Sequence, residues 1–270
     1  MEQFPPELAR LALRTPTLPP ATHTNCYFLG DQRLTIVEPA SPWEEEQALL
    51  ERTLQSLPGT IERIFLTHHH MDHVGGVEVL RRRFNCPVVA HARTAELLTG
   101  HVKVDETLDE GDVLLTDQGA WNVFHTPGHA SGHLCLANPR TGDFVVGDMV
   151  AGEGTIVLDP SDANLQDYLD SLQRLRDASP GVLHPAHGDP IQDADGKLAE
   201  YIDHRHMRTG QVRETLDGVE HATPMDLVPP IYPDLPVGFH PVAARQVLCH
   251  LQWLADQGEV REVDGAWEMA

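Results

Sequence analysis

Residues 67–76 read THHHMDHVGG, and this stretch decides the architecture that we expect. It follows an apolar run, so we place it in a loop at the end of a buried strand. Positions 68 and 70 alternate and therefore point their imidazoles the same way, while Asp72 and His73 turn toward a neighbouring point. Neutral imidazole and carboxylate are ligands for zinc, iron and manganese. The cluster His68, His70, Asp72 and His73 thus predicts a site for two metal ions.

Two features of the same stretch have other roles. His69 lies between two of these residues but points to the other side in this geometry, so we leave it out of the ligand set. The Gly75-Gly76 pair gives the backbone room to turn into the next helix.

Apolar runs alternate with helical periodicity over roughly the first 190 residues, and several of these runs lead into a polar loop that holds His or Asp. Strand, helix and strand in succession indicate an α/β architecture. We expect strands within 25–37, turning at Gly30-Asp31, and at 61–67, 87–91, 113–125, 134–148 and 181–183, with helices at 43–57, 74–84 and 162–177.

A boundary near residue 195 separates this region from a helical C-terminal part. The sequence predicts helices at 196–216, 225–231 and 241–257, and a hairpin turning at Asp264-Gly265. Helices followed by a small hairpin resemble a winged helix. We therefore predict a catalytic domain at residues 1–195 and a winged-helix-like domain at residues 196–270.

Composition narrows the class of protein. The chain has 270 residues, 17 histidines and a formal net charge of −22, which disfavours nucleic acid and anionic membranes as partners.

The four cysteines, Cys26, Cys86, Cys135 and Cys249, form no CxxC pair and stand in apolar surroundings, so we expect free buried thiols. The first 20 residues lack an apolar h-region and no segment is long enough to span a bilayer, so we expect a cytoplasmic protein.

THHHMDHVGG resembles the HxHxDH motif of the metallo-β-lactamase superfamily. TPGHASGH at 126–133, Gly147-Asp148 and PAHG at 185–188 resemble its later motifs, in the same order, and the likeness spans roughly residues 22–190. Within the superfamily the lactamase-β-2-like branch fits best. The resemblance implies an αββα sandwich with a small C-terminal winged-helix-like domain. It also implies that His68, His70 and His129 hold a first metal, that Asp72, His73 and His187 hold a second, and that Asp148 bridges both.

The chemistry implied is hydrolysis. Two cations, most simply Zn, with Fe or Mn as alternatives, lower the pKa of a shared water from about 15.7 toward 7 and polarise the group under attack. Asp72 and Asp148 are the residues that we expect to act in catalysis. Glu38-Pro39-Ala40 stands where relatives usually have Asp, a small residue and Gly, and Ala186 replaces a usual Gly; both departures reshape loops without removing a ligand.

Other polar residues are assigned supporting roles. We expect His133 to orient a ligand rather than to bind metal, since ligating histidines need such partners. His91 and His184 support loops. Arg205 and Arg208, one turn apart on a helix, suit either an anionic substrate group or an ion pair within the protein.

The sequence leaves three activities to compare. The first is hydrolysis of small esters, thioesters or lactones, and small molecules are accordingly the partners that we expect. The second is an endoribonuclease cutting single-stranded RNA, which the acidic charge disfavours: residues 196–270 carry six basic against twelve acidic side chains. The third is a mononuclear-iron dioxygenase of the same fold, which needs fewer ligands. A homodimer is an open alternative to a monomer.

Overall fold

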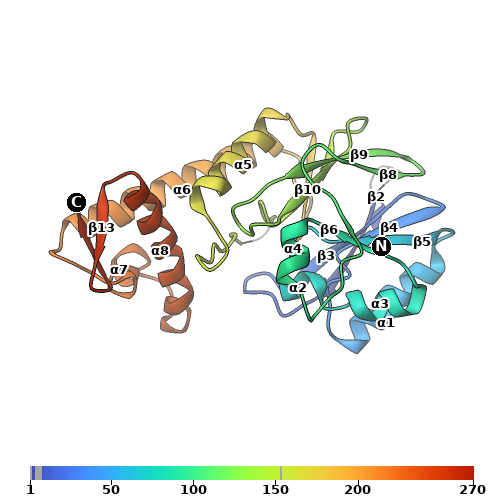
Figure 1. Ribbon diagram of the computed structural model, residues 1–270, viewed down its shortest axis with the longest axis horizontal. Helices are drawn as coiled ribbons and strands as arrows, with labels where there is room; N and C mark the ends of the chain where they lie inside the picture. The colour runs from blue at the N-terminus through green and yellow to red at the C-terminus, as the bar shows by residue number, and fades with distance from the viewer. Residues whose placement is uncertain (1, 4–7, 153) are drawn as a thin grey trace. The chain divides into compact units, whose positions relative to one another are not determined.

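The computed structural model describes residues 2–3, 8–152 and 154–270 (Figure 1). Residues 1 and 4–7, part of the N-terminal segment in which we expect no apolar h-region, therefore lie outside the described residues. The chain divides into two compact units: unit 1 is Met1–Thr126, Gly132–Ile156 and Ala178–Asp195, and unit 2 is Pro127–Ser131, Val157–Asp177 and Gly196–Ala270. One border falls at the expected position near residue 195, yet two earlier segments join unit 2. The predicted domain limits stay a prediction.

Unit 1 contains a seven-stranded sheet in the order β1-β2-β3-β4-β5-β6-β7. Its first four strands pair antiparallel, and β4 to β7 pair parallel. Gly30, with φ +98°, forms the turn predicted between β3 and β4. The strands are β1 (Glu2–Gln3), β2 (Leu8–Arg14), β3 (His23–Leu29), β4 (Arg33–Val37), β5 (Thr60–Phe65), β6 (Val88–Ala90) and β7 (Glu106–Thr107).

A second, five-stranded sheet of unit 1 has the order β12-β11-β10-β9-β8. All its pairs are antiparallel except β11 with β12, which run parallel. These strands are β8 (Val113–Thr116), β9 (Gly119–His125), β10 (Leu134–Ala137), β11 (Asp143–Gly147) and β12 (Val182–Pro185).

Two apolar cores hold these layers together. Between the sheets, one face of the first, including Tyr27 and Phe65, packs against Trp121, Leu136 and Val145 of the second. The other face of the first sheet packs against helices α1 (Glu44–Ser56) and α3 (Val77–Phe84), seen below that sheet in Figure 1. Burial on both faces explains why consecutive apolar residues end both strands, Ile36-Val37 in β4 and Ile64-Phe65 in β5.

The helix expected at 74–84 begins three residues later, and a separate short helix precedes it, which corrects the prediction. Helix α2 (Met71–Val74) ends before Gly75, and α3 begins after Gly76. The N–H groups of Gly75 and Gly76 donate to the carbonyls of Ala40 (3.1 Å) and Pro39 (2.8 Å). A Cβ at Gly76 would lie 2.4 Å from that Pro39 oxygen, so the glycine pair lets two backbones meet directly.

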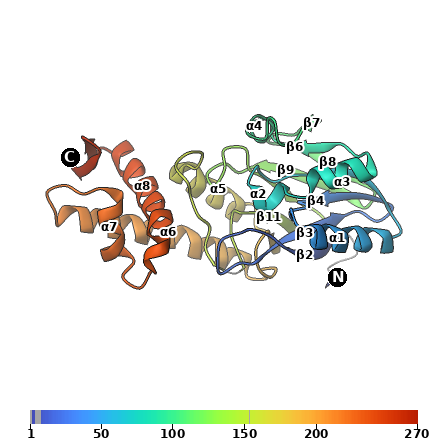
Figure 2. The same ribbon diagram turned by 90° about the horizontal axis from the view of Figure 1, so that it is seen from below.

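Unit 2 contains a helical C-terminal module, residues 196–270, in which α7 and α8 lie beside the C-terminal half of α6 (Figure 2). Helix α6 starts two residues earlier than expected, and the hairpin turns at Asp264-Gly265 as predicted. Leu216, Val247 and Trp267 belong to the module's own apolar core. The elements from α5 onward, apart from β12 of unit 1, are α5 (Leu165–Asp177), α6 (Ala194–Asp217), α7 (Pro224–Ile231), a 3-10 turn (Val237–Phe239), α8 (His240–Asp256), β13 (Val260–Val263) and β14 (Ala266–Met269). The remaining helix, α4 (Ala92–Leu97), belongs to unit 1.

The four cysteines are free and buried, as the sequence predicts. Burial raises the pKa of the Cys249 thiol to about 12, so it stays a neutral thiol near pH 7. Among the described residues, no helix combines the length and apolar character needed to cross a membrane.

Glycine substitutions test the tight approach at the α2–α3 break. Gly76→Ala forces the Pro39 carbonyl to move, so we expect a lower urea midpoint of unfolding. Gly210, inside α6, has no atom within 4 Å of a built Cβ. Gly210→Ala should therefore stabilise by about 0.5–1 kcal/mol, because alanine is the better helix former. Equal midpoints for the two variants would contradict this account.

Acid sensitivity of unit 2 is expected to depend on His250 of α8. Its Nδ1–H donates to Thr209 Oγ1 (2.8 Å), which itself donates to the Arg205 carbonyl (3.0 Å). Burial, with help from Arg205, lowers the pKa of His250 to about 3. The folded state therefore keeps His250 neutral, whereas the unfolded chain protonates it near its ordinary pKa, so stability falls as pH drops below about 6.5.

His250→Gln keeps a donor near Thr209 but cannot titrate. Urea unfolding at about pH 7 and about pH 5 should show wild type losing up to about 2 kcal/mol more than the variant over this range. A wild-type-to-variant difference that does not change with pH would refute the assignment.

Candidate metal centre

The carboxyl ends of two parallel strand pairs carry Glu38 and three of the predicted ligands. Glu38 directly follows β4, and His68 lies three residues after the end of β5. Asp148 directly follows β11, and His187 lies two residues after the end of β12. The carboxyl ends of parallel strands are where open α/β sheets place their sites. Strand order therefore explains why residues 38, 68, 148 and 187 lie together although the sequence separates them widely.

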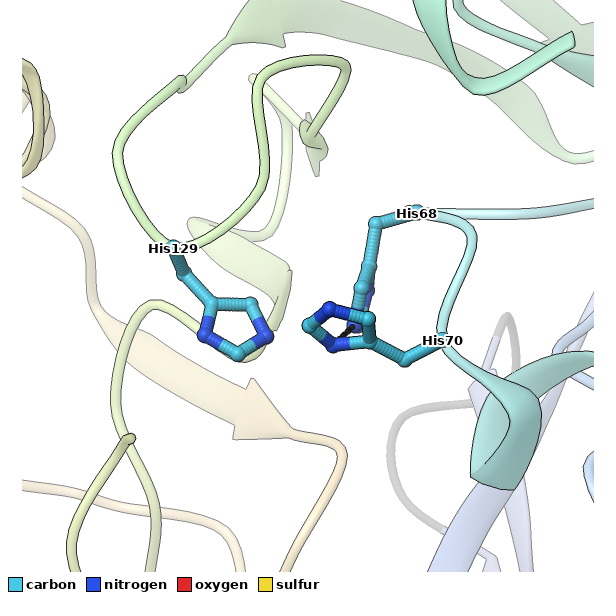
Figure 3. Close-up of side chains that lie close together, drawn as sticks. All are labelled: His68, His70 and His129. Atoms are coloured by element: carbon cyan, nitrogen blue, oxygen red, sulfur yellow. Dashed lines mark hydrogen bonds between the residues drawn. The ribbon is translucent and has the colours of Figure 1, made fainter. Parts of the chain in front are cut away.

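The first group contains three histidines. His68, His70 and His129 each offer a ring nitrogen, and these atoms lie within 4.8 Å of one another (Figure 3). His68 Nε2 is 3.0 Å from His70 Nδ1, so positions 68 and 70 do share one side, as expected. His69 belongs to none of the candidate groups that the described residues form, and its ring centre is 6.4 Å from that of His68.

The second group is Asp72, His73 and His187, again within 4.8 Å. Asp72 Oδ2 lies 3.6 Å from His187 Nε2, and Asp72 Oδ1 lies 3.8 Å from His73 Nε2. His73 Nε2 is buried and has no hydrogen-bond partner among the described residues. A buried ring nitrogen of this kind needs a partner, and a bound cation would satisfy it.

Asp148 lies between two histidines of the second group. Its Oδ2 is 3.5 Å from His73 Nε2, and its Oδ1 is 3.4 Å from His187 Nε2. Its backbone N–H donates to His133 Nε2 (3.1 Å), which holds the strand end in place. Asp148 thus reaches the second group, while its expected bridge to the first ion stays a prediction, as does the seven-ligand set.

Hydrogen bonds orient two of the imidazoles, and an ion pair orients a third. His129 Nδ1 lies 2.8 Å from the Val157 carbonyl oxygen, and His187 Nδ1 lies 2.9 Å from the His23 carbonyl oxygen. His73 Nδ1 lies 3.0 Å from Glu38 Oε1. Carbonyl oxygens only accept, so Nδ1 carries the proton in His129 and in His187. A neutral ring then has its lone pair on Nε2, the nitrogen that faces the other ligands.

Charge in the centre favours cations. Burial alone would lower the pKa of His73, but the Glu38, Asp148 and Asp72 carboxylates outweigh it and raise that pKa well above its ordinary value. Burial would raise the pKa of Asp148, yet His187 and His73 hold it well below its usual range. Buried carboxylates demand positive charge nearby. Divalent ions supply that charge, so the donor set fits metals.

Glu38 is a site residue that the sequence marked only as a departure from the family pattern. It is fully buried, contacts His73 as described, and accepts a hydrogen bond from Thr67 Oγ1. Its φ of +55° is unusual for a residue other than glycine, and such strain concentrates at functional sites. An acidic residue directly after a buried strand was the available signal, because that is also the position of Asp148.

The loop that carries His187 has its own support, which the sequence did not reveal. Asn25 Nδ2 donates to the carbonyls of Pro185 (2.9 Å) and Gly188 (2.7 Å), and Tyr27 Oη donates to the Pro185 carbonyl (2.7 Å). Both side chains come from β3 and are almost fully buried. Polar residues pointing inward from a buried strand were the signal for this contact.

Three other histidines have supporting contacts. His133 joins Thr126 Oγ1 (2.8 Å) to the Asp148 backbone, and His184 Nε2 lies 2.7 Å from Asp143 Oδ1. His91 forms a further candidate group with Asp109 and His125. Its Nδ1, however, accepts the N–H of Arg93 (3.1 Å), which places the ring proton on Nε2 and removes the lone pair that a metal would need there. We therefore assign His91 a capping role for α4.

The two arginines of interest both lie on α6. Arg205 stacks on Tyr168, with Cζ 5.1 Å from the ring centre, and donates to Gln246 Oε1 (3.3 Å). Arg208 stacks on Tyr232 at 4.4 Å and donates to the Ile231 carbonyl (3.2 Å). These contacts pack both side chains within unit 2.

Comparison with known proteins identifies relatives of both regions. Residues 19–187 match the metallo-beta-lactamase superfamily, and residues 223–267 match the beta-lactamase associated winged helix domain. The chain is 32% identical over 250 residues to a Beta-lactamase-like protein 2 homolog of Drosophila melanogaster, covering 88% of this chain and 84% of that protein.

Two further relatives bear on activity and fold. An atrochrysone carboxyl ACP thioesterase of Passalora fulva is 29% identical over 248 residues, covering 86% of this chain and 70% of that protein. A solved metallo-beta-lactamase family protein of Thermus thermophilus superposes with a TM-score of 0.84 at 23% identity, covering 98% of this chain and 99% of the other. The expected sandwich with an added winged helix is thereby confirmed.

A charge-removing substitution tests the assigned role of Glu38. Glu38→Gln keeps the shape but removes a buried negative charge behind His73, so we expect divalent metal affinity to fall about 10- to 100-fold. Competition with a chromophoric chelator measures this affinity. Glu51→Gln, at an exposed ion pair with Arg83 (2.8 Å), serves as the control and should not change it. Unchanged affinity in Glu38→Gln would disprove the role.

Proposed function

Because this chain belongs to the metallo-beta-lactamase superfamily, we propose that it is a hydrolase that uses two divalent metal ions to cleave small esters, thioesters or lactones. The observation that carries the proposal is the second ligand group beside the first. Asp72, His73 and His187 gather their donor atoms within 4.8 Å. The first group adjoins them, because His68 and His70 lie in the same loop as Asp72 and His73, and the ring centres of His68 and His73 are 4.1 Å apart. A site for a single ion would need only one such group.

We assign His68, His70 and His129 to a first ion, and Asp72, His73 and His187 to a second, with Asp148 shared by both. The first group offers nitrogen alone, and the second mixes nitrogen with carboxylate oxygen. Zinc accepts both kinds of set, and iron or manganese suits the second as well. Zinc is therefore the proposed metal, with iron and manganese as alternatives.

Two bound cations would supply a hydroxide nucleophile at neutral pH and a Lewis acid for the carbonyl oxygen. The protein's residues supply position and charge. Asp72 is 19% exposed at its side chain, more than the 9% of Asp148, so it is the carboxylate open to an incoming water and can accept its hydrogen bond. The backbone of Asp148 is held by His133, which fixes the carboxylate that the two ions would share.

Three properties support a small carbonyl substrate. One relative is named an atrochrysone carboxyl ACP thioesterase. The net charge of −22 repels RNA phosphates, which argues against the endoribonuclease alternative. Met71, between the ligands His70 and Asp72 in the chain, is 58% exposed. A flexible thioether at this rim suits the hydrocarbon part of an acyl group.

A substrate panel with and without chelator tests the proposal. We expect chelator-sensitive hydrolysis of one or more aryl esters, acyl thioesters or lactones, and restoration by added zinc. Asp148→Ala should reduce the rate on the order of 100-fold or more, because a lost ligand harms the centre more than a lost outer partner does.

The control is Asp177→Ala, which removes an exposed carboxylate at the end of α5 and should retain the wild-type rate. Labelled single-stranded RNA belongs in the same panel. Cleavage of RNA without turnover of any carbonyl substrate would overturn the proposal in favour of the endoribonuclease.

A further inference from the structure

The loop that carries His129 is fastened to the segment before and within α5. Ser171 Oγ donates to the Pro127 carbonyl (2.7 Å), and the Asn164 N–H donates to the Gly128 carbonyl (2.9 Å). The Ser131 N–H donates to Asp162 Oδ2 (2.9 Å). Residues 127–131 therefore belong with residues 157–177, and both lie in unit 2.

Backbone packing fixes this loop closely. Gly128 has φ +133°, and a Cβ built on it would lie 2.2 Å from Cα of Tyr168. No side chain fits at that position, so the loop lies directly on helix α5. The residue before His129 thus has little freedom to move independently of α5.

The imidazole itself is held by the carbonyl of Val157. His129 Nδ1–H donates to that oxygen at 2.8 Å, which selects the tautomer that presents Nε2. A shift of the Val157 peptide would rotate the ring or break the hydrogen bond that fixes the proton on Nδ1. The orientation of the His129 ring therefore depends on where residues 157–159 lie.

Helix α8 of the C-terminal module contacts the next two residues. Gln246 Nε2 and Cys249 Sγ (3.5 Å) both donate to the Leu158 carbonyl, and Arg245 Nη2 lies 2.6 Å from Asp159 Oδ1. Gln246 Oε1 in turn accepts from Arg205 of α6. Helix α8 therefore contacts the peptide that follows Val157 directly, while α6 supports it only through Gln246.

The same helix is anchored in the core of the module. Val247 and Leu251 of α8 are fully buried there, one and five residues beyond Gln246. Gln246 is thus a fixed point rather than a mobile surface side chain. The ion pair of Arg245 is half exposed and contributes less, since exposed pairs are weak.

We propose that the C-terminal module positions a metal ligand: helix α8, through Gln246 and the Leu158–Asp159 backbone, sets the orientation of His129. Gln246 acts here as a positioning residue with no contact to metal or substrate. The inference rests on the proposed metal centre but not on which substrate is hydrolysed. It gives the C-terminal module a structural role in metal binding that involves no nucleic acid. The six basic and twelve acidic residues of this module agree with such a role.

Cobalt substitution of the full chain tests this inference without an activity assay. Co²⁺ bound to nitrogen and oxygen ligands absorbs visible light with an intensity that reports ligand number and geometry. Gln246→Met keeps the side chain's length and removes both hydrogen bonds. We expect it to weaken binding of one of the two Co²⁺ ions about 10- to 100-fold and to alter the spectrum. Arg245→Ala should act in the same direction with a smaller effect, and Arg245→Lys should restore wild-type binding.

Two controls separate positioning from stability. Arg213→Ala breaks an ion pair with Glu259 (2.9 Å) inside the same module, far from residues 157–159 in the chain. It should lower the thermal midpoint yet leave the Co²⁺ spectrum unchanged. His129→Ala should lose the same ion that Gln246→Met weakens.

The outcomes are distinct from those of the substrate panel. Co²⁺ binding in Gln246→Met equal to that of Arg213→Ala would overturn the proposal, as would wild-type Co²⁺ binding in His129→Ala. Failure to hydrolyse any carbonyl substrate, with weakened Co²⁺ binding in Gln246→Met, would overturn the proposed substrate class and leave the positioning role supported.

Discussion

The structure depends on the burial of negative charge around His73. Glu38 lies behind the ring, and Asp72 and Asp148 lie in front, while His73 itself is inaccessible to solvent. Three carboxylates around one imidazole repel one another unless positive charge joins them. The raised pKa of His73 and the lowered pKa of Asp148 are the response of the protein to that demand. Divalent cations would meet it with stronger and better directed bonds than protons.

The fold supplies this arrangement through the ends of parallel strands. β4 and β5 deliver Glu38 and the histidine loop, and β11 and β12 deliver Asp148 and the loop of His187. Glycines then bring the loops close. Gly147, with φ +47°, would place a Cβ 2.5 Å from His133 Nε2, so only glycine lets β11 end beside that ring. The geometry of the proposed ligands is therefore a property of the two sheets together with the contacts behind the histidines.

Most strands and the common side of His68 and His70 could be predicted from the sequence. Alternating and continuous apolar runs located the strands, and the spacing of His68 and His70 fixed their common side because a short extended loop repeats every two residues. The break between α2 and α3 could not be predicted, since it depends on the carbonyls of Pro39 and Ala40, which are distant in sequence. The same holds for Glu38, Asn25 and Tyr27, whose partners come from other strands. The association of residues 157–177 with the C-terminal module likewise rests on contacts between widely separated segments, as between Gln246 and Leu158.

We propose that this chain holds two metal ions in one centre. Metal analysis of the purified protein by mass spectrometry under native conditions, with elemental quantification on the same sample, measures this most directly. We expect two divalent ions per chain, both removed by chelator and both restored by zinc. A single iron per chain that cannot be joined by a second ion would contradict the claim and would favour the mononuclear-iron dioxygenase instead.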